Sequence, residues 1–196
     1  MRYYVKTVKE INWEDAEIAP ISHYAWGDMY TPEAEARLLY IENRGLAAQL
    51  CCRENDPKTV YQQFYEPVYK DSCLEFFFAV EKNGIYVNCE MNSAGASLIA
   101  VGKSRKNRIR IDEIIVPPTV RTDKRNGVWS VEVLFTLDDL ARIFGEILLE
   151  AGVTLYGNFY KCGDETEIKH YGMWSPIGTA EPDFHRPEHF GELIII

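Results

Sequence analysis

Short runs of β-branched and aromatic residues recur along the whole chain, and they constrain its fold more than any other feature. About ten such runs are present, separated by turn signals of glycine, asparagine and proline. They are residues 2–8, 36–42, 45–52, 73–80, 84–91, 97–102, 109–116, 128–135, 154–160 and 192–196. Because helices do not alternate with these strands, the pattern predicts an all-β fold, an antiparallel β-sandwich of the immunoglobulin-like or jelly-roll-like kind.

One segment departs from this pattern and predicts a helix over residues 137–151. Thr136 is placed to act as the N-cap, aspartates follow it in the first turn, and Gly152 supplies a stop. Apolar residues recur at helical spacing, so we expect this helix to pack on the sandwich. The segments 43–45 and 82–84 each contain asparagine and glycine, which favour hairpin turns.

The negative net charge of the chain disfavours some classes of binding partner. Lysine and arginine number 21 against 30 aspartates and glutamates, a net charge of −9 at pH 7. This disfavours nucleic acid and anionic lipid as partners. The charged N-terminus leaves no apolar run for a signal peptide, and no stretch approaches the length of a membrane span. We therefore expect one cytoplasmic domain, residues 1–196, with no nucleic-acid or membrane partner and with its oligomeric state open. The five cysteines include no C-x-x-C pair, which indicates reduced thiols.

Two strands carry rows of polar and aromatic side chains that suggest a binding surface. Alternation places Asn88 and Glu90 on one face of their strand, and it places Asn158 and Tyr160 on one face of theirs. A solvated outer face is the alternative for both rows. Glu75, within CLEFFF, points away from its apolar neighbours and needs a partner if it is buried. Arg105, Arg108, Arg110 and a ligand hydroxyl are the candidate partners.

Two segments near the end of the chain raise the question of a ligand or a metal. Trp174, in a loop beside polar residues, could stack on a sugar ring, with core packing as the alternative. His185 and His189 have the H-x-x-x-H spacing of a metal pair, but Pro187 disfavours the helix that would make them converge. We interpret this segment as locking the last strand, with His185 free to donate to a ligand or to a backbone carbonyl.

Several sequence blocks occur together in a recognisable order. They are VYKDSCLEFFF, YVNCEMNSAGAS, GKSR, VWSVEVLF, GNFYKCG and HYGMWSP followed by PDFHRPEHFG. In this order, over about residues 32–196, the chain resembles the carbohydrate-binding family 9-like proteins, single-domain relatives of the family 9 carbohydrate-binding modules of xylanases. The resemblance implies an antiparallel β-sandwich that binds sugars through aromatic and polar side chains without cleaving them, with calcium possible as a supporting ion.

The resemblance also implies roles for particular residues. Its D-S-x-x-E pattern falls on Asp71 and Glu75, preceded by Tyr69, where the modules often have tryptophan. Its late tryptophan is Trp174, and its N-x-Y pair is Asn158 with Tyr160. The candidate ligand-binding residues are therefore Tyr69, Asp71, Glu75, Glu90, Arg105, Asn158, Tyr160, Trp174 and His185.

The sequence leads to an expected function and two alternatives. We expect non-catalytic binding of a mono- or oligosaccharide, in support of poly- or oligosaccharide catabolism. A glycoside hydrolase would instead use carboxylates such as Glu75 and Glu90 as acid and base. A haem-binding sandwich would need an axial ligand such as Met91 or Met173 with a histidine. Calcium is a further possibility, for which the loop carboxylates Asp71, Asp123 and Asp164 are available. 

Overall fold

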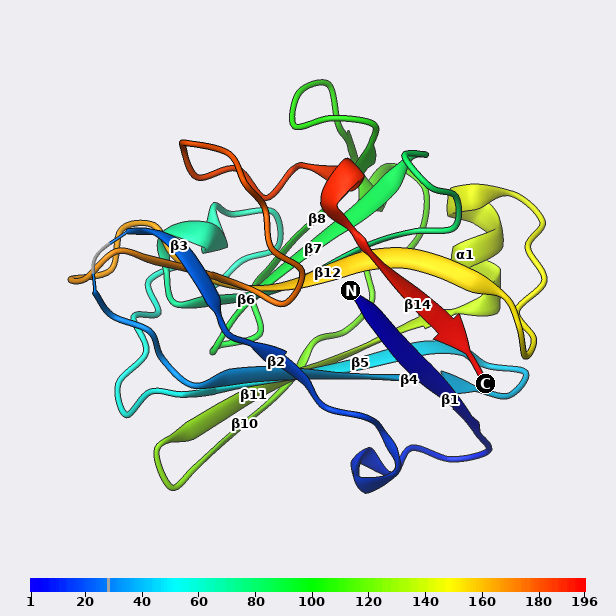
Figure 1. Ribbon diagram of the computed structural model, residues 1–196, viewed down its shortest axis with the longest axis horizontal. Coiled ribbons are helices and arrows are strands. Elements are labelled where there is room, and N and C mark those ends of the chain that lie inside the picture. Colours follow the sequence, from blue (N-terminus) through cyan, green and yellow to red (C-terminus); the bar gives the residue numbers. More distant parts are fainter. Residues whose placement is uncertain (28) are drawn as a thin grey trace.

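The computed structural model describes residues 1–27 and 29–196, and most of their regular secondary structure is β-strand (Figure 1). The strands are β1 Arg2–Val8, β2 Ala19–Ile21, β3 His23–Gly27, β4 Ala34–Ile41, β5 Gly45–Arg53, β6 Cys73–Ala79, β7 Tyr86–Asn92, β8 Ser97–Gly102, β9 Ile109–Arg110, β10 Arg121–Arg125, β11 Val128–Thr136, β12 Thr154–Gly163, β13 His170–Met173 and β14 Gly191–Ile195. Short 3-10 helices are η1 Trp13–Asp15, η2 Val68–Lys70, η3 Ile111–Glu113 and η4 Pro187–His189. The prediction of an all-β fold is confirmed.

Strand β1 joins two groups of strands into one curled, mixed sheet. The order along the sheet is β10-β11-β5-β4-β1-β14-β12-β6-β7-β8-β9, with β2 on β4, β13 on β12 and β3 on β13. The first half of β1 pairs parallel with β14, and its second half pairs parallel with β4. The purely antiparallel sandwich is therefore not confirmed, because alternation along a strand specifies its faces but not the direction of its neighbour.

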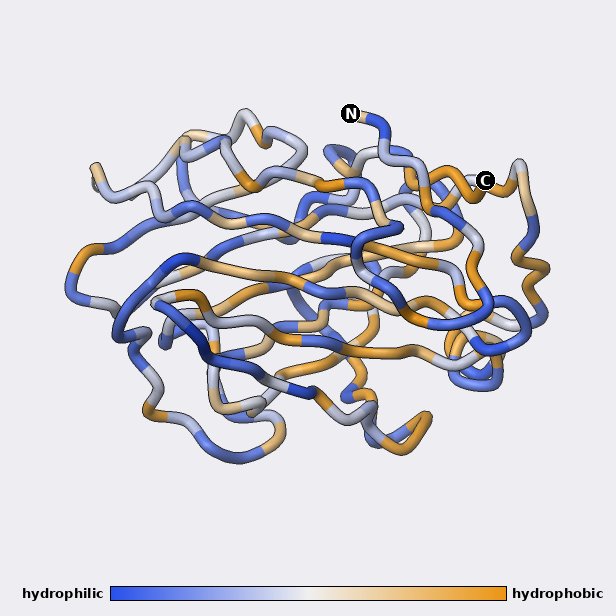
Figure 2. Tube along the Cα trace, turned by 90° about the horizontal axis from the view of Figure 1, so that it is seen from below, coloured by the Kyte–Doolittle hydropathy of each residue, from blue (hydrophilic) through white to orange (hydrophobic). Residues whose placement is uncertain are grey.

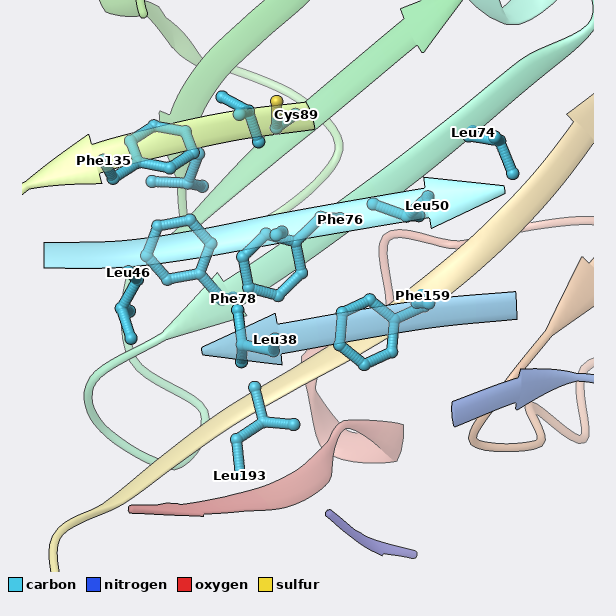
Figure 3. Packing of buried hydrophobic residues seen from close by; sticks show 14 of the residues in the cluster. Leu38, Leu46, Leu50, Leu74, Phe76, Phe78, Cys89, Phe135, Phe159 and Leu193 are labelled. Carbon is cyan, nitrogen blue, oxygen red and sulfur yellow. The ribbon is translucent and has the colours of Figure 1, made fainter. Parts of the chain in front are cut away.

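Two arms of this sheet, β10-β11-β5-β4 on one side of β1 and β14-β12-β6-β7-β8-β9 on the other, enclose a core of large apolar side chains. Figure 2 shows the strands running side by side with hydrophobic and hydrophilic residues alternating along them. In Figure 3, side chains from both arms meet, among them Leu38 and Phe135 from one arm and Phe76 from the other. Phe76 stacks on Phe78 and Phe159, with ring centroids 4.8 and 5.2 Å apart. Burying a side chain of this size stabilises the fold by about 1.5–3 kcal/mol, so each of these rings contributes substantially to its stability.

The single α-helix of the described residues is shorter than its apolar pattern suggests. Helix α1 spans Leu137–Phe144, not 137–151. Its start is as predicted: the Thr136 hydroxyl accepts from the Asp139 amide at 3.1 Å, and the Asp139 carboxylate accepts from the Thr136 amide at 2.9 Å. Its end was predicted wrongly, because Gly145 adopts a φ of 88° and stops the helix one turn after the buried Leu140.

The predicted turns are present, and one of them depends on glycine. Asn43 and Asn83 both adopt a φ of 58°, as the hairpin prediction requires. Gly45 has a φ of 143°, and a Cβ there would overlap the carbonyl oxygen of Phe135. No other residue type fits at Gly45 without moving the backbone of β11.

We therefore expect Gly45→Ala to lower the free energy of unfolding by about 2 kcal/mol or more, from backbone strain together with overlap. Gly178→Ala is the matched control, because a Cβ at Gly178 meets nothing within 4 Å. Urea denaturation of the two variants checks this prediction. Equal midpoints would contradict the close approach of the two strands.

The segment before β14 anchors that strand, as expected for FHRPEHFG. The buried Phe184 ring stacks on Tyr160 at 4.0 Å, and the Ser175 hydroxyl donates to the carbonyl of His189 at 2.9 Å. Gly191 lies against the ring of Trp174, where a Cβ would overlap it. This packing explains why the segment ends on glycine.

Candidate functional site

A cavity of about 410 Å³ opens over the polar face of strands β6, β7 and β8. Its floor comes from these strands, and its walls come from the segment before β6, the loop after β8, the ends of β12 and β13 and the segment 182–185. Its lining residues are Tyr65, Tyr69, Glu75, Asn88, Glu90, Leu98, Ala100, Arg105, Arg108, Cys162, Asp164, Tyr171, Pro182, Asp183, Phe184 and His185. The cavity lies within the size range of small-molecule sites in proteins.

Two buried carboxylates lie side by side on the cavity floor. Glu75 on β6 is paired in register with Glu90 on β7, so their side chains project from the same face of the sheet. Only 2% of Glu75 and 4% of Glu90 is exposed to solvent. The strands place them there because Leu74 and Phe76, the neighbours of Glu75, face the core on the other side.

Burial raises the pKa of both carboxyl groups, which makes them weaker acids than usual. It raises the pKa of Glu90 to about 7, against smaller opposing effects of the Asn88 amide and of Arg108. Burial, and then the nearby charge of Glu90, raise the pKa of Glu75 well above its ordinary value. The pair is therefore partly protonated near neutral pH, and it can both donate and accept hydrogen bonds.

One oxygen of this pair has no partner among the described residues. Glu90 Oε1 accepts a hydrogen bond from Asn88 Nδ2 at 2.9 Å, while the buried Glu90 Oε2 accepts none. Asn88 Oδ1 in turn accepts from Arg108 Nε at 2.7 Å, which fixes the orientation of the amide. A buried carboxylate oxygen without a donor is costly, so its position over the cavity suits a donor on a ligand.

The basic residues of the cavity differ in how many hydrogen bonds they already make within the protein. Arg108 donates to the carbonyls of Tyr86 and Ala100 at 2.9 and 3.2 Å, so it holds the floor in place. Arg105 lies at the mouth, with 67% of its side chain exposed and 4.0 Å from Asp183. Burial, and then Arg108, lower the pKa of His185 to about 3, so that this ring is neutral near pH 7. Arg105 is therefore the cation available to a ligand at the mouth.

Tyrosines provide the aromatic surface of the cavity. Tyr65 and Tyr69 come from the segment before β6, and both are partly exposed. Arg110 lies 4.2 Å over the Tyr65 ring and holds it in place. Tyr171 donates its hydroxyl hydrogen to Asp164. Flat rings beside polar groups are the usual surface for the C–H face of a sugar.

The structure brings together five of the residues proposed from sequence, namely Tyr69, Glu75, Glu90, Arg105 and His185. Asp71 does not line the cavity: its Oδ2 accepts from the amides of Val60 and Tyr61 at 2.9 and 3.0 Å. It therefore shapes the long loop before β6.

Asn158, Tyr160 and Trp174 lie beneath the surface and not in the cavity lining. The Asn158 amide exchanges two 2.8 Å hydrogen bonds with the backbone of Ser175, which fixes the chain after β13. Tyr160 is covered by Phe184. Trp174 is 2% exposed and packs edge-on against Tyr3, so core packing, the alternative considered from sequence, is what the structure shows.

Several lining residues were not proposed as ligand contacts from sequence. They are Tyr65, Asn88, Arg108, Asp164, Tyr171 and Asp183. The sequence did indicate two of them indirectly. Asn88 shares its predicted face with Glu90, and Arg108 was a candidate partner for Glu75. The acids Asp164 and Asp183 lie in loops, where no periodicity indicates a direction.

The residues considered for metals and haem do not form such sites. Within residues 1–27 and 29–196, no three His, Cys, Asp or Glu side chains cluster as they would to hold a metal ion. Of the loop carboxylates considered for calcium, Asp123 pairs with Arg125 on β10, far in the sheet order from the cavity that contains Asp164. Met91 and Met173 are buried in apolar clusters, away from the cavity lining. The described helices include none long and apolar enough to cross a membrane.

Comparison with known proteins identifies the family. The model of the carbohydrate-binding family 9 matches residues 5–195, so the chain belongs to this family. No curated protein matches the sequence.

Solved structures share this fold. A crystal structure of a candidate carbohydrate-binding protein from Bacteroides uniformis ATCC 8492 is 26% identical, with a TM-score of 0.82, and the match covers 100% of this chain and 99% of that one. A family 9 module from Caldicellulosiruptor kristjanssonii in complex with glucose is 14% identical, with a TM-score of 0.72 and coverage of 100% and 96%. A complex of a family 9 module from the same organism with cellotriose is 12% identical, with a TM-score of 0.69 and coverage of 100% and 93%.

Proposed function

We propose that the chain binds the end of a mono- or oligosaccharide in the cavity over β6 to β8 and does not cleave it. The observation that carries this proposal is a buried oxygen of Glu90 that has no hydrogen-bond partner in the described part of the chain, on a floor flanked by tyrosine rings. Family membership supports it, as do the similar modules that bind glucose and cellotriose. The protein would serve saccharide catabolism, and its location in the cytoplasm stays a prediction.

In this proposal each side chain has a defined part. Tyr69 and Tyr65 stack on the C–H face of the sugar, while Glu75 and Glu90 accept from its hydroxyl groups. Arg105, at the mouth, donates to a ring or hydroxyl oxygen. Asn88 and Arg108 hold the floor so that the carboxylates keep their positions.

We also infer that the two arms of the sheet act as the layers of a β-sandwich. They bury the larger apolar cluster between them. The polar face of β6 to β8 therefore lies on the side away from this core, where a ligand can reach it.

The hydrolase alternative has one observation in its favour, since Glu75 and Glu90 do share a cavity. Glycosidases, however, place their two carboxylates on either side of the scissile bond. Glu75 and Glu90 are register partners on adjacent strands and approach a ligand from the same side. Non-catalytic binding is therefore the better account, and the absence of reducing-sugar release from cellotriose would agree with it.

Calorimetric titration with glucose, xylose, galactose, cellobiose and cellotriose tests the proposal. We expect saturable binding of at least one of these sugars. Tyr69→Ala should weaken it about tenfold, because an aromatic stack contributes on the order of 1 kcal/mol. Tyr4→Ala removes an exposed tyrosine on β1 and should leave affinity unchanged. Absence of binding by the folded protein, or equal effects of the two variants, would contradict the site.

A further inference from the structure

The cavity is lined by more acidic than basic side chains, and this imbalance bears on which sugar it takes. Its lining includes four acids, Glu75, Glu90, Asp164 and Asp183, but only two arginines, Arg105 and Arg108. We infer that the sugar bound here carries a protonated amino group, held between Glu75 and Glu90. This inference rests on the proposed function and specifies its ligand class.

Neither floor carboxylate has a cation of its own within the described ranges 1–27 and 29–196. No ion pair within 4.0 Å joins Glu75 or Glu90 to a lysine, an arginine or a histidine there. Arg108 lies close by, but its Nε donates to Asn88 and its other nitrogens donate to backbone carbonyls. Two buried carboxylates without a cationic partner are costly when they are ionised, and burial therefore raises the pKa of both. A cation on the ligand would offset this cost and favour the ionised pair.

The geometry indicates where the compensating charge belongs. Glu90 Oε2 is buried and has no partner among the residues that the structure describes, and Glu75 is the register partner of Glu90 on the neighbouring strand. An ammonium group has three N–H donors and can reach two adjacent carboxylates at once. A sugar hydroxyl has one donor and no charge, so it lacks the Coulomb attraction that an ammonium group has for a carboxylate.

The preference for an amino sugar over its neutral parent should change with pH. The charged groups facing the pair are Arg105, Arg108, Asp164 and Asp183, while the facing His185 ring is neutral near pH 7. Because burial raises the pKa of Glu90 to about 7, lowering the pH from 7 to 5 protonates it and removes the charge that favours an ammonium ion. The preference for the amino sugar should therefore be greater at pH 7, where Glu90 is partly ionised, than at pH 5.

Calorimetric titration of the protein at pH 7 with glucosamine, glucose and N-acetylglucosamine, and with galactosamine and galactose, tests the inference. We expect an amino sugar to bind at least about tenfold more tightly than its neutral parent, since its ammonium group adds the attraction of opposite charges to the hydrogen bond. N-acetylation, which removes the charge and keeps the nitrogen, should abolish this advantage. Glu90→Gln should abolish it as well, while Glu81→Gln, an exposed acid outside the cavity, should preserve it.

The outcomes separate this inference from the proposed function. Equal affinity for the amino sugar and its parent, or an advantage that survives Glu90→Gln, would overturn the inference and leave sugar binding in place. Tight binding of ethanolamine without a sugar ring would overturn it too, because the site would then recognise amines alone. Failure of every sugar to bind would overturn both proposals.

Discussion

Replacing Glu90 by glutamine is expected to stabilise the folded chain at pH 8 while it weakens the binding of sugar. Glu90 is buried, and its pKa in the folded state is raised to about 7 from an ordinary value of 4.5. An acid with a raised pKa favours folding most below its unfolded pKa, and that contribution is lost as the pH rises through the folded value. At pH 8 the ionised carboxylate therefore costs the folded state roughly 3 kcal/mol, a cost that a neutral glutamine removes.

The difference between the two proteins should therefore appear with pH in a particular window. The free energy of unfolding of Glu90→Gln relative to the natural chain should rise between about pH 4.5 and 7 and stay level above it. Urea denaturation at pH 5 and pH 8 measures this. The buried His170 and the half-buried His185 have pKa values lowered to about 4 and about 3. They destabilise both proteins alike as the pH falls below 6.5, so they cancel in the difference.

Stabilisation together with lost binding would identify Glu90 as a residue kept for its ligand. Glutamine retains an oxygen for the Asn88 amide, but it lacks the charge that strengthens a ligand hydrogen bond, so affinity should fall about tenfold. Glu81→Gln should change neither quantity, because Glu81 is exposed in the turn before β7. If Glu90→Gln is no more stable than the natural chain at pH 8, the ionised carboxylate of Glu90 does not destabilise the folded state, and the prediction is wrong.

Replacing Lys161 by methionine is expected to cause the largest loss of stability among single polar changes. Lys161 is fully buried on β12, and its Nζ donates to Ser72 Oγ at 2.9 Å and lies 3.4 Å from Glu54 Oε2. Burial alone would raise the pKa of Glu54, but Lys161 and the donors Ser72 and Trp129 lower it overall. Without the lysine an unpaired charge remains in the interior, and breaking a buried pair in this way costs about 3–5 kcal/mol.

The Lys161 prediction has a graded set of controls. Lys161→Met with Glu54→Gln should recover part of the loss, because no uncompensated charge then remains. Lys6→Met breaks an exposed pair with Asp15 and should change the free energy of unfolding by about 0.5 kcal/mol or less. Urea denaturation at pH 7 compares the variants, and equal losses for Lys161→Met and Lys6→Met would refute the buried pair.

The strands and the N-terminus of the helix could be predicted from the sequence, because they depend on the alternation of apolar and polar residues and on a local capping motif. The parallel pairing of β1 was not readable, because the same alternation serves either direction of a neighbouring strand. The helix was predicted too long for a related reason. Its apolar spacing continues past Gly145, and only the backbone conformation of that glycine ends it.

Part of the candidate site was predictable for a similarly local reason. Glu75 and Glu90 stand out as acids among apolar neighbours, and the structure places them together in one cavity. Trp174 was not placed correctly as a stacking surface, because it packs where Gly191 leaves room, and that contact depends on the tertiary fold. The tyrosines of the long loop, including Tyr65, take over the aromatic surface instead.

A crystal structure of the chain with a bound sugar tests the central claim most directly. We expect the sugar in the cavity over β6 to β8, with Tyr69 or Tyr65 against its ring and a donor of the sugar on Glu90 Oε2. A sugar bound elsewhere, for example in the hollow beside Trp13 and Arg121, with the β6 to β8 cavity empty, would contradict it.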